Sequence, residues 1–179
     1  VSGIQCYANA EILNGDRAGL RRYAEELGLE ISALVAELGG YGFQDEKENP
    51  GKLERMKQVF DAAGELGAKV VTGHIGVLPR DPAHPRYGVM LNALTALGHA
   101  AKERGIVFGI ETGPEDPEQL AEFLKKTEGG VGVNLDPANL VMVRNVSPVR
   151  AVEILRPWIV YTHAKDGLHH RDCDAEQVY

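Results

Sequence analysis

A unit of helix, glycine and strand recurs along the chain, and this repeat restricts the folds that the sequence can adopt. In each copy an amphipathic helix ends at glycine, the residue that most readily takes the left-handed conformation closing a helix. A short run of strand-forming residues then follows. The expected helix and strand pairs are 16–27 with 29–35, 51–66 with 68–75, 87–104 with 106–112, and 117–127 with 131–135. A fifth helix at 148–155 leads without glycine into a strand at 158–163, and a strand at 4–8 precedes them all.

The helix predictions rest on hydrophobic spacing and on start signals. Apolar residues recur at helical spacing in two of the ranges and predict one buried stripe on each helix: Leu53, Met56, Val59, Phe60, Ala63 and Leu66, and then Met90, Leu91, Leu94, Leu97 and Ala101. Asp116, Pro117 and Gln119 combine an N-cap, a first-turn proline and a capping-box partner. Ser147 and Pro148 repeat the first two of these signals.

Strict alternation of strands and helices predicts right-handed crossovers and a parallel sheet. An open doubly wound sheet and a closed barrel both fit that pattern. Polar residues sit at or just past the carboxyl ends of different strands: Glu37, His74, Glu111, Asp136 and His163. A barrel collects its functional groups around that rim, whereas an open sheet gathers them at one switch point. No glycine-rich phosphate loop appears either. We therefore expect an α/β fold of the (β/α)8 TIM-barrel type.

The length limits how much of such a barrel the chain can build. The 179 residues supply about six strands and five helices, whereas a complete eightfold barrel needs about 250 residues. A partial barrel would leave raw strand edges, which proteins normally avoid. We expect residues 1–179 to form one domain that lacks a βα unit before Val1 and the closing strand or strands after Tyr179.

Charge and cysteine content indicate which classes of partner and which cellular compartment suit the chain. The formal net charge of −7 disfavours nucleic acid, whose binding normally needs a basic face. The only cysteines, Cys6 and Cys173, match no metal-ligand spacing and are too few for a disulfide framework, which suits a reducing cytoplasm. No apolar run approaches the ~20 residues that cross a bilayer. These features predict a cytoplasmic protein that acts on a small molecule.

Three consecutive strands end in side chains that bind metals. Glu111 ends one strand, Asp136 the next and His163 the third. Adjacent parallel strands lie ~4.8 Å apart, so ligands from successive strand ends can converge on one cation. Two carboxylates and an imidazole, with no thiolate, favour Mn²⁺, Mg²⁺, Co²⁺ or Zn²⁺.

These segments resemble the xylose isomerase-like sugar phosphate isomerase/epimerase superfamily, which includes ketose 3-epimerases, hydroxypyruvate isomerases and inosose dehydratases. The resemblance extends from residues 2–5 (Ser-Gly-Ile-Gln) through 73–76 (Gly-His-Ile-Gly) to 163–166 (His-Ala-Lys-Asp). It implies that Glu111, Asp136 and His163 hold one divalent cation, with Mn²⁺ as the first candidate. In that family a glutamate on the final strand is the fourth ligand, and we expect that strand after Tyr179.

The resemblance also implies a reaction on a sugar or a sugar phosphate. The cation binds adjacent substrate oxygens and polarises the carbonyl, which acidifies the neighbouring C–H. One glutamate removes this proton to give an enediolate stabilised by the metal, and a proton then returns to the other face or to the adjacent carbon. Glu111 serves as both ligand and acid/base. His74, Lys165, Glu37 and Asn139 are candidates for binding the substrate.

Other functions remain open at this stage. Apurinic-site endonucleases share the barrel but carry a histidine three residues after the aspartate, where this chain has Asn139. That departure and the acidic charge argue for one metal and against DNA, although many ketose 3-epimerases also place a histidine there. Dehydration of an inosose-type polyol is the nearest enzymatic alternative. A sugar-binding relative without catalysis is another, and a homo-oligomer is one outcome for the assembly.

Each site residue also has a plainer interpretation. Asp136 before Pro137 could begin a turn. His74 could be a buried histidine that donates to a backbone carbonyl. His169 and His170 sit in a polar segment, and we interpret them as solvated loop.

Overall fold

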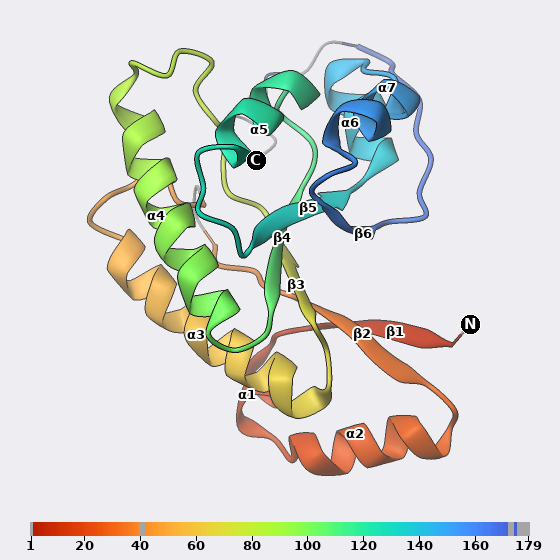
Figure 1. Ribbon diagram of the computed structural model, residues 1–179. Coiled ribbons are helices and arrows are strands. Elements are labelled where there is room, and N and C mark those ends of the chain that lie inside the picture. Colours follow the sequence, from red (N-terminus) through yellow and green to blue (C-terminus); the bar gives the residue numbers. More distant parts are fainter. Residues whose placement is uncertain (1, 40–41, 172–173, 175–179) are drawn as a thin grey trace.

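The computed structural model describes residues 2–39, 42–171 and 174, and it contains strands and helices in alternation (Figure 1). The strands are β1 (Gly3–Tyr7), β2 (Glu30–Val35), β3 (Val70–Gly73), β4 (Val107–Glu111), β5 (Val131–Leu135) and β6 (Ile159–Thr162). The helices are α1 (Ala10–Asn14), α2 (Arg17–Glu26), α3 (Asn49–Leu66), α4 (Pro85–Lys102), α5 (Pro117–Leu124), α6 (Pro137–Arg144) and α7 (Pro148–Leu155). None of the helices in these ranges is long and apolar enough to cross a membrane.

The six strands form one parallel sheet in the order of the sequence, β1-β2-β3-β4-β5-β6. Five spacings of ~4.8 Å would separate β1 from β6 by about 24 Å in a flat sheet. The Gln5 side chain on β1 nevertheless lies 3.2 Å from the ring of His163, just past β6. The Ser32 hydroxyl on β2 lies 2.8 Å from that of Tyr161 on β6. The sheet is therefore strongly curled into a partial (β/α) barrel, as expected.

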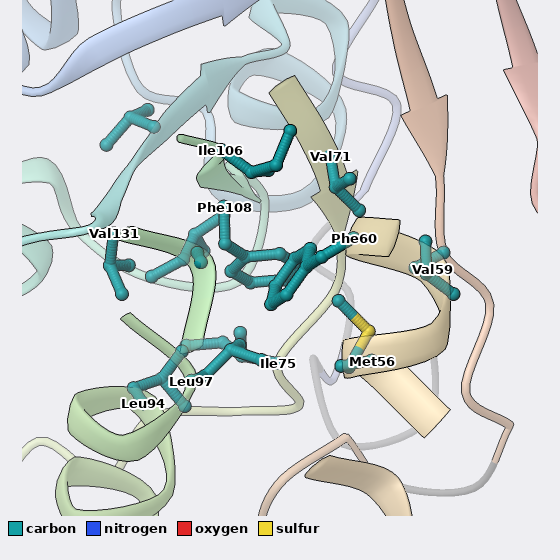
Figure 2. Packing of buried hydrophobic residues seen from close by; sticks show 14 of the residues in the cluster. Met56, Val59, Phe60, Val71, Ile75, Leu94, Leu97, Ile106, Phe108 and Val131 are labelled. Carbon is teal, nitrogen blue, oxygen red and sulfur yellow. The ribbon is translucent and has the colours of Figure 1, made fainter. Parts of the chain in front are cut away.

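The outward-facing strand residues pack against helices and form the hydrophobic core (Figure 2). Phe108 on β4 and Phe60 on α3 are both fully buried there. The predicted stripes of α3 and α4 face this core, with Leu53 and Leu91 at the partly buried margin. Burial on both faces of the central strands explains why their sequences are nearly continuous in apolar residues.

Two helices and one helix cap depart from the expectations. The short helices α1 and α6 were not predicted, and they raise the number of helices from about five to seven in the described ranges. Ser147 caps α7 through the N–H of Arg150, as expected. The capping box of α5 was wrong: the Asp116 side chain makes no cap hydrogen bond and instead binds arginine side chains. The Gln119 amide donates to the carbonyl groups of residues 78 and 79.

Cys6 carries a free thiol on β1, and burial raises its pKa. Cys173 lies outside the described residues. His169 lies in a loop, as predicted, and is partly exposed, with its Nδ1 3.2 Å from the Met142 carbonyl oxygen. His170 is exposed, as predicted.

A buried acid joins the loops that follow β3 and β4. Glu115 is 4% exposed, and its carboxyl group accepts a hydrogen bond from the Leu78 N–H. Its Oε1 has no hydrogen-bond partner among the described residues. Burial raises the pKa of Glu115 from 4.5 to about 8. The side chain is therefore an uncharged acid at neutral pH.

This buried acid makes stability depend on pH. Because the folded pKa is the higher one, the native chain keeps a proton that the unfolded chain has lost between pH 4.5 and about 8. Stability therefore falls as the pH rises through that window, by up to about 1.4 kcal/mol per pH unit. Glu115→Gln removes the buried acid and with it this pH dependence. The free energy of unfolding of the variant, relative to that of wild type, should therefore rise with pH in urea titrations from pH 5 to 8. A constant difference between the two proteins would contradict the assignment.

The exposed Glu122 on α5 offers the matched control for this experiment. Glu122→Gln makes the same chemical change at an exposed side chain and leaves the buried acid in place. Its stability relative to wild type should show no comparable rise between pH 5 and 8.

Candidate active site

A cleft of about 920 Å³ opens at the carboxyl ends of the strands. Six of the seven predicted site residues line it: Glu37, His74, Glu111, Asn139, His163 and Lys165. The seventh, Asp136, is fully buried beside them. The curled sheet therefore brings to one cleft the side chains that the sequence places at separate strand ends.

Glu111, Asp136 and His163 lie together at this cleft. The Nδ1 atom of His163 is 3.1 Å from Asp136 Oδ2 and 3.4 Å from Glu111 Oε1. One potential ligand atom from each residue lies within 4.8 Å of the other two. Glu111 and Asp136 are 7% and 0% exposed, so their charges are almost entirely removed from water. Buried carboxylates need compensating positive charge.

The local backbone holds Asp136 in place. Asp136 is the N-cap of α6, and its Oδ1 accepts from the N–H of Asn139 at 3.1 Å. The Thr112 hydroxyl, one residue past β4, lies 2.8 Å from the Asp136 N–H. One oxygen of Asp136, Oδ1, therefore has the local capping role of the plainer interpretation. The other oxygen, Oδ2, faces His163.

Asn139 contacts the second carboxylate of the group. Its Nδ2 donates to Glu111 Oε1 at 3.2 Å and lies at the same distance from the Thr112 carbonyl oxygen. The amide thus holds one oxygen of Glu111 toward the triad. Glu111 Oε2 faces the other way, with His74 Nε2 at 3.8 Å.

Lys165 supplies positive charge to the two buried carboxylates. Its Nζ lies 2.6 Å from Asp136 Oδ2 and 3.8 Å from Glu111 Oε1. Burial acts to raise the pKa of Asp136, but hydrogen bonds from Lys165, the Asn139 N–H and His163 outweigh it and lower the pKa overall. Partial burial acts to lower the pKa of Lys165, and its bond to Asp136 raises it overall. Both groups are thus held in their charged forms.

His74 and Glu37 lie farther out on the walls of the cleft. The side chain of His74 is 46% exposed. Its partial burial lowers its pKa, which favours the neutral ring. Glu37 is exposed two residues past β2. The histidine is therefore not the fully buried core residue of the plainer interpretation.

The donor set fits a divalent cation. Two carboxylate oxygens and one imidazole nitrogen converge, and no thiolate is among them. A cation bound there would also balance the charge of the buried carboxylates. Position 139, where apurinic-site endonucleases carry a histidine, holds an asparagine whose amide donates to Glu111.

Sequence reasoning gave no role to several polar residues inside the barrel. Gln5 contacts both His163 and the Thr72 hydroxyl, and Asn134 contacts the same ring. Thr72 and Asn134 are fully buried. The available signal was a polar residue within an otherwise apolar strand, but the contacts of Gln5 with Thr72 and His163 depend on the curvature of the sheet.

Solved structures share this fold at low sequence identity. A xylose isomerase domain protein from Planctomyces limnophilus matches with a TM-score of 0.87 and 21% identity over 96% of this chain and 66% of that one. A D-tagatose 3-epimerase-like protein matches with a TM-score of 0.76 and 20% identity over 92% of this chain and 67% of that one. A sugar phosphate isomerase/epimerase from Parabacteroides distasonis matches with a TM-score of 0.73 and 22% identity over 92% and 65%. The chain thus spans about two thirds of the length of these proteins.

No curated protein sequence matches the chain significantly. The family model described as "Xylose isomerase-like TIM barrel" matches residues 3–176, which is nearly the whole chain. The partial barrel and the position of the cleft agree with that match. The chain therefore belongs to the xylose isomerase-like TIM barrel family.

Proposed function

We propose that this protein is a divalent-metal-dependent isomerase or epimerase of a sugar or sugar phosphate. The observation that carries the proposal is the convergence of Glu111, Asp136 and His163 within 4.8 Å at the cleft. The family match supports it, as do structural relatives described as an epimerase-like protein and a sugar phosphate isomerase/epimerase. Mn²⁺ is the first candidate for the cation, because the ligand atoms are oxygen and imidazole nitrogen.

When bound, the cation would polarise the substrate carbonyl and acidify the neighbouring C–H. In this proposal Glu111 removes that proton, and its two oxygens have different surroundings. Oε1 accepts from Asn139 and faces His163, which assigns it to the metal. Oε2 faces His74 across 3.8 Å and is the proton acceptor in this proposal. Transfer to Oε2 leaves an enediolate, and return of the proton to the other face or to the adjacent carbon completes the reaction.

Substrate hydroxyls or a phosphate would bind around this carboxylate. His74 lies beside Oε2, and the half-exposed Lys165 lies between the buried carboxylates and the cleft. Glu37 and Asn139 line the same cleft and complete the proposed binding set. We expect the reaction to occur in the cytoplasm on a small sugar, in keeping with a chain that carries two cysteines and a net charge of −7.

Removal of a ligand should abolish tight metal binding. Loss of a residue that only hydrogen-bonds to a metal ligand commonly weakens metal binding about 10- to 100-fold, so the loss of a ligand itself should cost more than about 100-fold. We therefore expect His163→Ala to weaken Mn²⁺ binding by more than that factor in isothermal titration calorimetry. His99→Ala on α4 is the control, because His99 pairs with Glu128 at the surface and should leave Mn²⁺ affinity unchanged. Wild-type affinity in His163→Ala would refute the proposed site.

The chemical step is tested by exchange of substrate hydrogen with solvent. With Mn²⁺, the protein should incorporate deuterium from D₂O at one carbon of a ketose, and a chelator should stop the exchange. Glu111→Gln removes the proposed base and should lower the exchange rate by at least about 100-fold, the lower range for general acid–base catalysis. Glu54→Gln on the exposed surface of α3 should exchange at the wild-type rate.

The substrate panel should include keto-polyols and a DNA oligonucleotide with an abasic site. Exchange accompanied by loss of water would indicate the dehydratase alternative. Nicking of the oligonucleotide would replace the proposal with hydrolytic chemistry. An absence of exchange in every substrate, with Mn²⁺ bound, would favour a sugar-binding protein.

A further inference from the structure

We propose that Gln5 is a positioning residue: when a cation takes the place of the hydrogen bond from His163 Nδ1 to Asp136, Gln5 accepts the proton on Nε2 and so directs the Nδ1 lone pair to the cation. The inference rests on the proposed function, because it concerns the same metal site. It assigns a role to an interior side chain that does not belong to the metal triad or to the proposed substrate-binding set.

The orientation of the His163 ring separates its two nitrogens. Nδ1 faces the carboxylates, at 3.1 Å from Asp136 Oδ2 and 3.4 Å from Glu111 Oε1. Nε2 faces the barrel interior, away from the carboxylates. A neutral imidazole carries its proton on one nitrogen only, and a metal requires the lone pair of the other. Binding through Nδ1 therefore requires the proton on Nε2 and an acceptor beside it.

Gln5 provides that acceptor from the opposite edge of the sheet. Its Oε1 lies 3.2 Å from Nε2 of His163, while its own Nε2 donates to the Thr72 hydroxyl at 3.1 Å. Thr72 is fully buried on β3 and fixes the far end of the amide. The contact joins β1 to the end of β6, so it exists only because the sheet is curled.

Asn134 also lies beside this nitrogen, but the atom that it presents is a donor. Its Nδ2 lies 3.3 Å from Nε2 of His163, and its Oδ1 is buried without a hydrogen-bond partner among the described residues. The acceptor for an Nε2 proton is therefore the amide oxygen of Gln5.

The direct test is the Mn²⁺ affinity of Gln5→Met, a variant of similar size that lacks the acceptor. We expect affinity to fall about 10- to 100-fold in isothermal titration calorimetry, the usual effect of losing the hydrogen-bond partner of a metal-bound histidine. Thr72→Val, which removes the partner that orients Gln5, should reduce affinity less. Ser32→Ala is the matched control, because it removes another interior hydrogen bond, to Tyr161, that does not involve His163. Its affinity should equal that of wild type.

A second readout separates positioning from general damage to the fold. Protein labelled with ¹⁵N-histidine and loaded with Zn²⁺ should show His163 with the metal on Nδ1 and a proton on Nε2. In Gln5→Met the Nε2 proton should exchange faster with water, while thermal unfolding remains similar to that of Ser32→Ala. Metal on Nε2, or unchanged Mn²⁺ affinity and proton exchange in Gln5→Met, would overturn the inference and leave the proposed reaction intact. A wild-type protein that binds no divalent cation would overturn both.

Discussion

Parallel pairing in sequence order places the carboxyl ends of all six strands at one rim, and the curl of the sheet turns that rim into a cleft. The curl is visible in two interior contacts, Gln5 with His163 and Ser32 with Tyr161. Without it, His163 would remain near Asp136 on the neighbouring strand, but Gln5 would lie on the far side of a flat sheet. The same curvature thus forms the cleft and brings Gln5 into contact with His163.

The burial of two carboxylates determines which charged groups lie at this rim. Glu111 and Asp136 lose nearly all contact with water, and the nearby charged or polar groups compensate them in part. Lys165 binds Asp136 directly, and Asn139 donates to Glu111. Such an arrangement favours the ionised form of Asp136, and the converging oxygens of the two residues are suited to a cation. It also places a lysine where it can interact with both the carboxylates and a molecule in the cleft.

The sequence predicted the parts of the fold that depend on local patterns. Runs of strand-forming residues identified all six strands, and a glycine-terminated helix precedes four of them. Helix α6 was missed because it is short and because Asp136 before Pro137 also suits a turn. Strand-end position was enough to group Glu111, Asp136 and His163. The contact between Gln5 and His163 was not predicted, because contacts between β1 and the end of β6 depend on the curvature of the whole sheet rather than on neighbouring residues.

The central claim is that Glu111, Asp136 and His163 together hold one divalent cation. Crystals of the protein soaked in Mn²⁺ and measured at the manganese absorption edge test it most directly. We expect one strong anomalous peak in contact with both carboxylates and with Nδ1 of His163. A manganese peak elsewhere in the cleft, with none at these three side chains, would contradict it.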